Sequence, residues 1–101
     1  MYYAFQRVEG GNRFVPVQGR KVEFEGFGDF EFFYYKEYKA DEYQILEART
    51  GLAVGSGEKL KYAKNLARLN LQIKGAEELK KIIEKKIKKH GISPRYEEVK
   101  Q

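Results

Sequence analysis

The stretch FEFFYYKEY, residues Phe30–Tyr38, is the most aromatic part of the chain. Successive side chains of a β-strand point to opposite faces, so Phe32 and Tyr34 are expected on one face. Phe33 and Tyr35 are expected on the other face, which makes both faces largely aromatic. A sheet that helices cover on one side needs only one apolar face. We therefore expect the second face to be covered by a curled sheet, a second subunit or a ligand.

Short segments with strand character surround this stretch. Besides Phe30–Tyr38, we expect strands over residues 2–8, 13–18, 22–27, 43–49 and 52–54. Gly, Asn and Asp separate several of them, and these residues favour tight turns. Pro16 has no N–H to donate, so the second strand is expected at a sheet edge. The short connections favour hairpins and therefore antiparallel pairing.

From Glu58 onward the spacing of apolar residues becomes helical. The apolar stripe covers about 200° of a helical wheel; its members are Leu60, Tyr62, Ala63, Leu66, Ala67, Leu69, Leu71 and Ile73. So wide a stripe predicts a helix buried against a sheet and against something else. Ser56 is expected to cap the helix, with Glu58 in its first turn.

A glycine punctuates each end of a second expected helix. Gly75 should break the first helix, and a second helix is expected over Ala76–His90. Gly91 is expected in a left-handed conformation as the C-cap, and Pro94 blocks continuation. Residues 92–101 are expected to form a loose tail. The predicted fold is α+β in a single domain, residues 1–101. A mainly antiparallel five- to six-stranded sheet occupies residues 1–57, and two helices in residues 58–91 pack on one face.

Composition narrows the classes of protein that the chain can belong to. The 101 residues are 42% hydrophobic and 35% charged, a globular balance. The absence of Cys excludes disulfides and thiolate metal sites. No stretch approaches the roughly 20 apolar residues of a membrane span, and no signal peptide is evident. We expect a soluble protein of the cytoplasm.

Residues suited to catalysis are scarce. His90 is the sole histidine, and its place at a helix C-terminus favours a capping role. No nucleophile–base set can be assembled around it, and the carboxylates lack EF-hand spacing. Gly55–Lys59 is the single candidate anion pocket, but Glu58 would face the phosphate. We therefore expect no enzyme activity, no cofactor and no metal.

Positive charge is concentrated in the second half of the chain. Residues 61–101 hold 12 of the 20 Lys and Arg, for a chain with a net charge of +5. Helical spacing aligns two basic stripes, and ordinary solvated helix faces account for both. The first stripe consists of Lys61, Lys64 and Arg68, and the second of Lys81, Lys85, Lys88 and Lys89. If both stripes faced the same way, they would form a surface for a phosphate backbone.

One segment resembles an RNA-binding signature. Gly26–Phe32 has aromatic spacing similar to that of the RRM family, whose aromatic strand stacks bases. Glu25 stands where that signature has a basic residue, and Asp29 where it has an aromatic one. Core packing in an aromatic hairpin therefore accounts for the segment better.

A second resemblance covers roughly residues 43–95. Glu47–Gly57, a helix containing Ala63 and Ala67, and then Gly91–Arg95 form a pattern of strand, Thr-Gly turn, short strand, glycine, helix and Gly-Ile-Ser-Pro. This pattern resembles small uncharacterised proteins encoded by phages and prophages of Gram-positive bacteria. More loosely, the strand–glycine–helix part resembles small antitoxin-like modules. The phage resemblance implies an accessory role, such as modulating a host protein or countering a defence system.

These observations favour a small non-enzymatic binding protein that acts through protein contacts. A homodimer is expected, since one layer of helices leaves the second aromatic face uncovered; its expected surface is Phe33, Tyr34, Tyr35 and Tyr38. A host protein is a further possible partner, and no membrane partner is expected. Two alternatives stay open, namely nucleic-acid binding by the basic helical stripes and sequestration of a small ligand or nucleotide.

Overall fold

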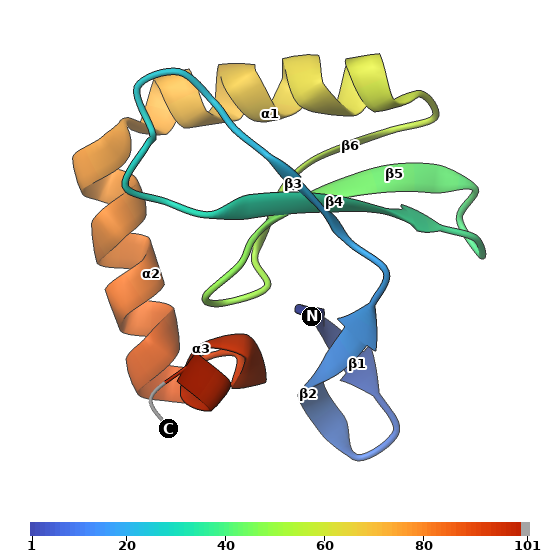
Figure 1. Cartoon of the computed structure of the whole chain (residues 1–101), viewed down its shortest axis with the longest axis vertical. Coiled ribbons are helices and arrows are strands. Elements are labelled where there is room, and N and C mark those ends of the chain that lie inside the picture. The colour runs from blue at the N-terminus through green and yellow to red at the C-terminus, as the bar shows by residue number, and fades with distance from the viewer. Residues whose placement is uncertain (100–101) are drawn as a thin grey trace.

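The fold, seen in a computed structural model that describes residues 1–99, is α+β with antiparallel sheets (Figure 1). The elements in chain order are β1 (Tyr2–Val8), β2 (Gly11–Val17), β3 (Arg20–Val22), β4 (Phe32–Glu37), β5 (Glu42–Glu47), β6 (Ala53–Gly57), α1 (Leu60–Lys74), α2 (Ala76–His90) and α3 (Pro94–Val99). The α+β class and the antiparallel pairing are as the sequence predicts.

The strands form two sheets, and the prediction of one five- to six-stranded sheet is wrong. β1 pairs only with β2, while β3, β4, β5 and β6 form a four-stranded sheet in that order. The β1–β2 hairpin lies on the side of the four-stranded sheet away from α1 (Figure 1). The second face of β4 is aromatic, so the β1–β2 hairpin can pack against it as a separate layer. This packing explains why the strands form two sheets.

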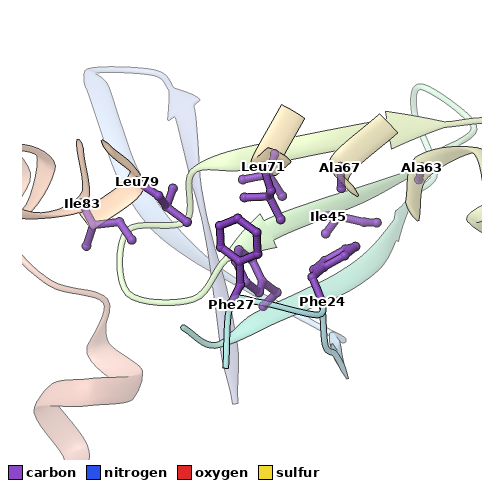
Figure 2. Packing of buried hydrophobic residues seen from close by; sticks show 10 residues of the cluster. Phe24, Phe27, Ile45, Ala63, Ala67, Leu71, Leu79 and Ile83 are labelled. Carbon is purple, nitrogen blue, oxygen red and sulfur yellow. The ribbon is translucent and has the colours of Figure 1, made fainter. Parts of the chain in front are cut away.

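The predicted strand over residues 22–27 ends at Val22. Alternation of apolar and acidic residues continues beyond it, but Gly26 has a φ of 85° and turns the chain. The rings of Phe24 and Phe27 consequently enter the core from a loop (Figure 2). In the segment Gly26–Phe32, only Phe32 lies in a strand, so the segment does not form an RRM-like aromatic strand.

The principal core lies between one face of the four-stranded sheet and the helices. α1 and α2 both contribute to it, as predicted for helices packed on one face (Figure 2). Its buried members are Phe24, Phe27, Phe32, Ile45, Val54, Ala63, Ala67, Leu71, Leu79 and Ile83. Phe32 and Ile45 are almost completely buried and provide the centre of this layer.

α1 buries a much narrower face than its apolar stripe predicts. Only Ala63, Ala67 and Leu71 are buried on it. A Cβ placed on Gly55 would come within 2.7 Å of the Ala67 backbone nitrogen, so β6 and the helix are in close backbone contact. Small residues on both elements permit this approach, and an approach so close leaves room for only one row of side chains beneath the helix.

The boundary of α1 also differs from the prediction. Its N-cap is Lys59, which makes no side-chain cap hydrogen bond, and no acidic residue lies in its first turn. Ser56 belongs to β6 instead, so the predicted cap is wrong. Gly55 and Gly57 belong to β6 and permit its close packing on α1, which accounts for the glycines of the Gly55–Lys59 motif without an anion pocket.

The two predicted glycine boundaries are confirmed. Gly75 lies between α1 and α2 with a φ of 82°, and Gly91 ends α2 with its N–H bonded to the Ile87 carbonyl. The ψ of Gly91 is 175°, which is outside the left-handed helical region that we expected. The prediction of a loose tail is wrong for Pro94–Val99, which form α3. Residues 100–101 lie outside the described part.

A second core covers the other aromatic face of β4. Its buried members are Ala4, Phe33, Leu46 and Ala48, with Tyr2, Val17, Tyr35 and Tyr96 packed against them. The cover therefore comes from the β1–β2 hairpin and from α3 of the same chain. The second aromatic face of β4, which suggested a second subunit or a ligand as its cover, is covered by residues of the same chain.

Candidate functional site

The four aromatic residues expected on a partner surface lie in different places. Phe33 has no exposed surface, so its inclusion in a contact surface is wrong. Tyr35 faces the second core, and its hydroxyl accepts a hydrogen bond from Gln6. Tyr34 packs at the margin of the principal core. Tyr38 is 83% exposed at the end of the β4–β5 hairpin. The structure does not gather these residues into one surface.

Glu31 is the centre of a polar junction that sequence reasoning missed. Its carboxylate accepts hydrogen bonds from the Tyr2 and Tyr96 hydroxyls and from two guanidinium nitrogens of Arg95, at 3.0 and 2.9 Å. The Arg95 hydrogen bonds lower the pKa of Glu31 to about 2, against the opposing effect of burial. The junction joins three segments that are distant in sequence, around Tyr2, Glu31 and Arg95. No local pattern in the sequence predicts it.

Glu47 is a buried carboxylate, with no exposed surface. It accepts hydrogen bonds from the Arg49 and Thr50 backbone N–H groups and from the Thr50 hydroxyl. Burial raises its pKa, although these donors act in the opposite direction. All of its partners lie in the adjacent β5–β6 turn, so we assign Glu47 to holding that turn.

Other groups that could support catalysis are engaged structurally. The His90 ring packs on Phe5 with 4.8 Å between ring centroids, which links α2 to the hairpin. Within residues 1–99, no cluster of His, Cys, Asp and Glu suits a metal ion. In the same range, every buried side-chain nitrogen and oxygen has a hydrogen-bond partner. No polar group is therefore left aimed at a missing ligand in the part that the structure describes.

A cavity of about 380 Å³ lies between the β1–β2 hairpin, the β5–β6 turn and α2. Asn12, Gln44, Lys86 and His90 are among the residues that line it. It is the place where a small ligand could bind under the sequestration alternative. Asn12 and Lys86 are exposed to solvent, so the lining does not form an enclosed site.

Basic and aromatic side chains meet beside the N-terminal half of α1, in a region that we call the basic corner (Tyr34, Lys36, Tyr43 and Lys64). Lys64 Nζ lies 6.0 Å from the centre of the Tyr34 ring, and Lys36 Nζ lies 4.8 Å from that of Tyr43. The two rings meet edge to face. The corner combines cations with aromatic rings, as surfaces that bind single-stranded nucleic acids do.

The remaining predicted basic residues divide between the two helices. Lys61 and Arg68 continue the Lys64 flank of α1, where Arg68 donates a hydrogen bond to Asn65. Lys81 and Lys85 are exposed on the side of α2 opposite its buried Leu79 and Ile83. α2 runs at a steep angle to α1 (Figure 1), so the two stripes do not continue each other along one helix axis.

The exposed apolar side chains of α1 form a separate row. Tyr62, Leu66, Leu69 and Ile73 are 50%, 42%, 56% and 84% exposed. Their spacing of four, three and four residues places them along one flank of the helix, about 130° from the buried face. We call this row the α1 seam. Lys64 and Arg68 lie on the opposite flank, whereas Lys61 Nζ lies 5.3 Å from the centre of the Tyr62 ring and Lys74 borders the cavity beside Ile73.

The α1 seam lies beside the free edge of the four-stranded sheet. A cavity of about 390 Å³ there is lined by β6 and by Leu66, Leu71 and Ile73, among others. Asn70 donates a hydrogen bond of 2.9 Å to the carbonyl oxygen of Val54 in β6. The seam, the cavity and this strand edge together form one apolar surface feature.

The wide apolar stripe of α1 was visible in the sequence, but we expected it to be buried and part of it is exposed. All four seam residues belong to the stripe that predicted burial against two elements, and the structure buries only the adjoining row.

None of the described helices is long and apolar enough to cross a membrane. Comparisons of the chain with models of protein families, with curated proteins and with solved structures find no match.

Proposed function

We propose that this chain is a small non-enzymatic binding protein, and that it acts by contact of the α1 seam with another protein. The observation that carries the proposal is the row Tyr62, Leu66, Leu69 and Ile73, which is exposed at helical spacing. An exposed apolar row bordered by polar residues is typical of protein-contact surfaces. A helix face with this spacing is also the form in which helices are commonly recognised by partners.

The energetics support a contact role. Burial of one exposed leucine-sized side chain contributes roughly 1.5–3 kcal/mol, and the seam offers four large apolar side chains. The fold itself gains little from them, because Ala63, Ala67 and Leu71 already provide the packing of α1 on the sheet. A partner that covers the seam therefore gains burial that the isolated chain leaves unused.

The cellular role that we propose is that of a phage or prophage accessory protein. Its support is the resemblance of residues 43–95 to small phage-encoded proteins. In such a role the seam would contact a protein of the bacterial host or a second copy of the chain. The host cytoplasm is the setting that we propose for either contact.

Capture from bacterial lysate tests the proposal. Tagged chain should retain a partner after nuclease treatment, and Leu66→Asp/Leu69→Asp should lose it. Ala76→Asp/Lys80→Asp is the control, because it also adds two aspartates at exposed helical positions away from the seam, although it lowers the net charge by three and the seam variant lowers it by two. Equal capture by both variants, or loss of the partner on nuclease treatment, contradicts a contact through the seam.

A second candidate function, binding of single-stranded nucleic acid, is favoured by the basic corner. Lys64 and Lys36 lie over the rings of Tyr34 and Tyr43, and Lys61 and Arg68 extend the positive charge along α1. Bases stack on aromatic side chains while lysines neutralise phosphates, so affinity should fall steeply with salt.

Fluorescence anisotropy with labelled single-stranded oligonucleotides tests this second candidate. Lys61→Ala/Lys64→Ala/Arg68→Ala should weaken binding for all sequences alike. Lys80→Ala/Lys88→Ala/Lys89→Ala removes the same number of charges from α2 and should bind like the unmodified chain. Absence of binding at low salt, or equal weakening by both triple variants, rejects a site on this flank.

A further inference from the structure

We propose that a second copy of this chain binds the α1 seam, with the two α1 helices antiparallel across a two-fold axis that passes between Leu66 and Leu69. The inference rests on the proposed function, because it requires the seam to be a protein-contact surface. It adds the identity of the partner, the direction of the helices and the residues that meet.

The spacing of the seam is the first argument. Tyr62, Leu66, Leu69 and Ile73 are separated by four, three and four residues, a sequence of intervals that is the same in both directions. A two-fold interface brings the same surface of both copies together, so residue i meets j and j meets i. An antiparallel pair therefore places Leu66 against Leu69 of the second copy, and Tyr62 against Ile73.

The helix geometry suits such a pair. Alternating intervals of three and four residues are those of the apolar positions in coiled coils, where each side chain enters a gap on the facing helix. The approach of two helices to 8–10 Å requires side chains that project freely. All four seam residues are exposed, and Ile73 is 84% exposed.

The distribution of charge is the second argument. A chain with a net charge of +5 would repel its own copy if lysines faced each other at the contact. The residues that border the seam between Leu66 and Ile73 are uncharged, and they are Asn65, Asn70 and Gln72. Lys64 and Arg68 project from the opposite flank, where Lys64 lies over the ring of Tyr34. Lys59 and Lys61 lie 6.0 and 5.3 Å from the centre of the Tyr62 ring, at the end of the seam. The middle of α1 can therefore meet itself without opposing like charges.

The edge of the sheet beside the seam indicates a helix contact in preference to strand addition. β6 is one of the two edge strands of the four-stranded sheet, and such edges are open to pairing with another strand. The Asn70 side chain donates a hydrogen bond of 2.9 Å to the carbonyl oxygen of Val54, the second residue of this five-residue strand. This hydrogen bond competes with an added strand at that carbonyl, which favours contact through the helix flank.

The cavity at the end of the seam accommodates a residue of the second copy. It has a volume of about 390 Å³ and is bordered by Ile73, Leu66 and Leu79. In the antiparallel pair, Tyr62 of the second copy lies opposite Ile73 and therefore beside this cavity. The ring enters its apolar part, and the Asn70 and Lys74 side chains at its border can meet the hydroxyl. The two-fold axis repeats this insertion at the other end.

Sedimentation equilibrium over micromolar to millimolar chain concentration tests the association. The mass should rise from 11.8 kDa to twice that value, with modest affinity because the interface is at the small end of specific interfaces. Ile73→Asp should shift the dissociation constant at least tenfold, and its folding is safe because the side chain is largely exposed. Ala76→Asp/Lys80→Asp should associate like the unmodified chain.

Cysteine cross-linking tests the direction, since the chain has no natural cysteine. Tyr62→Cys mixed with Ile73→Cys should give a disulfide-linked heterodimer on oxidation. Either variant alone should not, because positions 62 and 62 of the two copies lie roughly 16 Å apart along antiparallel helices. A disulfide requires Cα atoms within about 7 Å. Cross-linking of each variant with itself indicates parallel helices and overturns the proposal.

The outcomes separate this inference from the proposed function. A chain that stays monomeric at millimolar concentration overturns the second copy as partner. If Leu66→Asp/Leu69→Asp nevertheless abolishes capture of another protein from lysate, the seam is a contact surface for that protein alone. If the chain is monomeric and capture is unaffected by the seam variant, both the inference and the proposed function fail.

Discussion

The ring of Tyr2 is stacked on that of Phe33, with centroids 4.5 Å apart and planes inclined by 17°. Tyr2 belongs to the first strand, and Phe33 lies on the face of β4 turned away from α1. This contact places an aromatic ring from the start of the chain over the face that looked uncovered in the sequence. The face that looked uncovered is consequently covered from within the chain.

The Tyr2–Phe33 stack should contribute measurably to stability. Tyr2→Ala removes the stacked ring and its hydrogen bond to Glu31, so we expect a loss of about 1–3 kcal/mol in the free energy of unfolding. Urea denaturation followed by circular dichroism measures it. Tyr38→Ala is the control, since its ring is 83% exposed. Equal losses in both variants would mean that the hairpin does not depend on the stack.

Stability should depend on pH through Glu31. Its pKa is lowered to about 2 in the folded protein, from an ordinary value of 4.5. The contribution of the charged form is therefore complete above about pH 4.5 and is lost as the pH falls toward 2. Glu31→Gln should lower the melting temperature at pH 7, and the difference from the unmodified chain should shrink over that window.

An exposed carboxylate provides the control for the Glu31 experiment. Glu23 pairs with Lys21 at 3.4 Å on the surface, where both side chains are largely exposed. Glu23→Gln should have a melting temperature close to that of the unmodified chain at every pH. A Glu31→Gln difference that stays constant from pH 7 to pH 2 would assign the stabilisation to shape and not to charge.

The close approach of β6 and α1 should make Gly55 intolerant of a side chain. The Cβ of Gly55→Ala would lie 2.7 Å from the Ala67 nitrogen and 2.8 Å from the Ala63 oxygen, both backbone atoms. Moving the helix to relieve this overlap costs about 1–3 kcal/mol. Gly28→Ala adds the same methyl group where no atom lies within 4 Å. Thermal melts should therefore separate the two variants by several degrees.

The hydrogen bond from Asn70 should stabilise the edge of the sheet. Asn70→Ala leaves the Val54 carbonyl without its side-chain donor, and we expect a loss of about 1 kcal/mol in unfolding free energy. Asn65→Ala is matched, because it makes the same change in helix propensity at an exposed position of α1. Light scattering should also show more aggregation for Asn70→Ala, since the freed edge can pair with other chains.

Local signals in the sequence correctly predicted the elements that are bounded by glycines. Gly75 and Gly91 fix the ends of α2, and both have positive φ. The alternation of apolar and acidic residues after Val22 led to a wrong prediction of a strand over residues 22–27. The chain turns at Gly26, and Phe27 enters the core from a loop. Apolar alternation alone does not distinguish a strand from a loop whose aromatic side chains are buried.

The candidate site could be foreseen only in part, since its form depends on distant residues. The apolar positions of α1 were recognisable, but Gly55 and Gly57 on β6 decide how close the helix lies and so which positions stay exposed. The cover of Phe33 likewise depends on Tyr2 and Tyr96, which are far from it in sequence. Such long-range pairing has no local period, and the Glu31 junction was missed for the same reason.

The Glu31 junction has a consequence for synthesis of the chain. Its carboxylate and the Tyr2 hydroxyl that it binds precede Arg95 and Tyr96 in the chain, and Arg95 follows Glu31 by 64 residues. The hairpin layer can therefore acquire its full set of contacts only after α3 has left the ribosome. Contacts of the hairpin that form during translation have to persist, or form again, without the Glu31 junction until then.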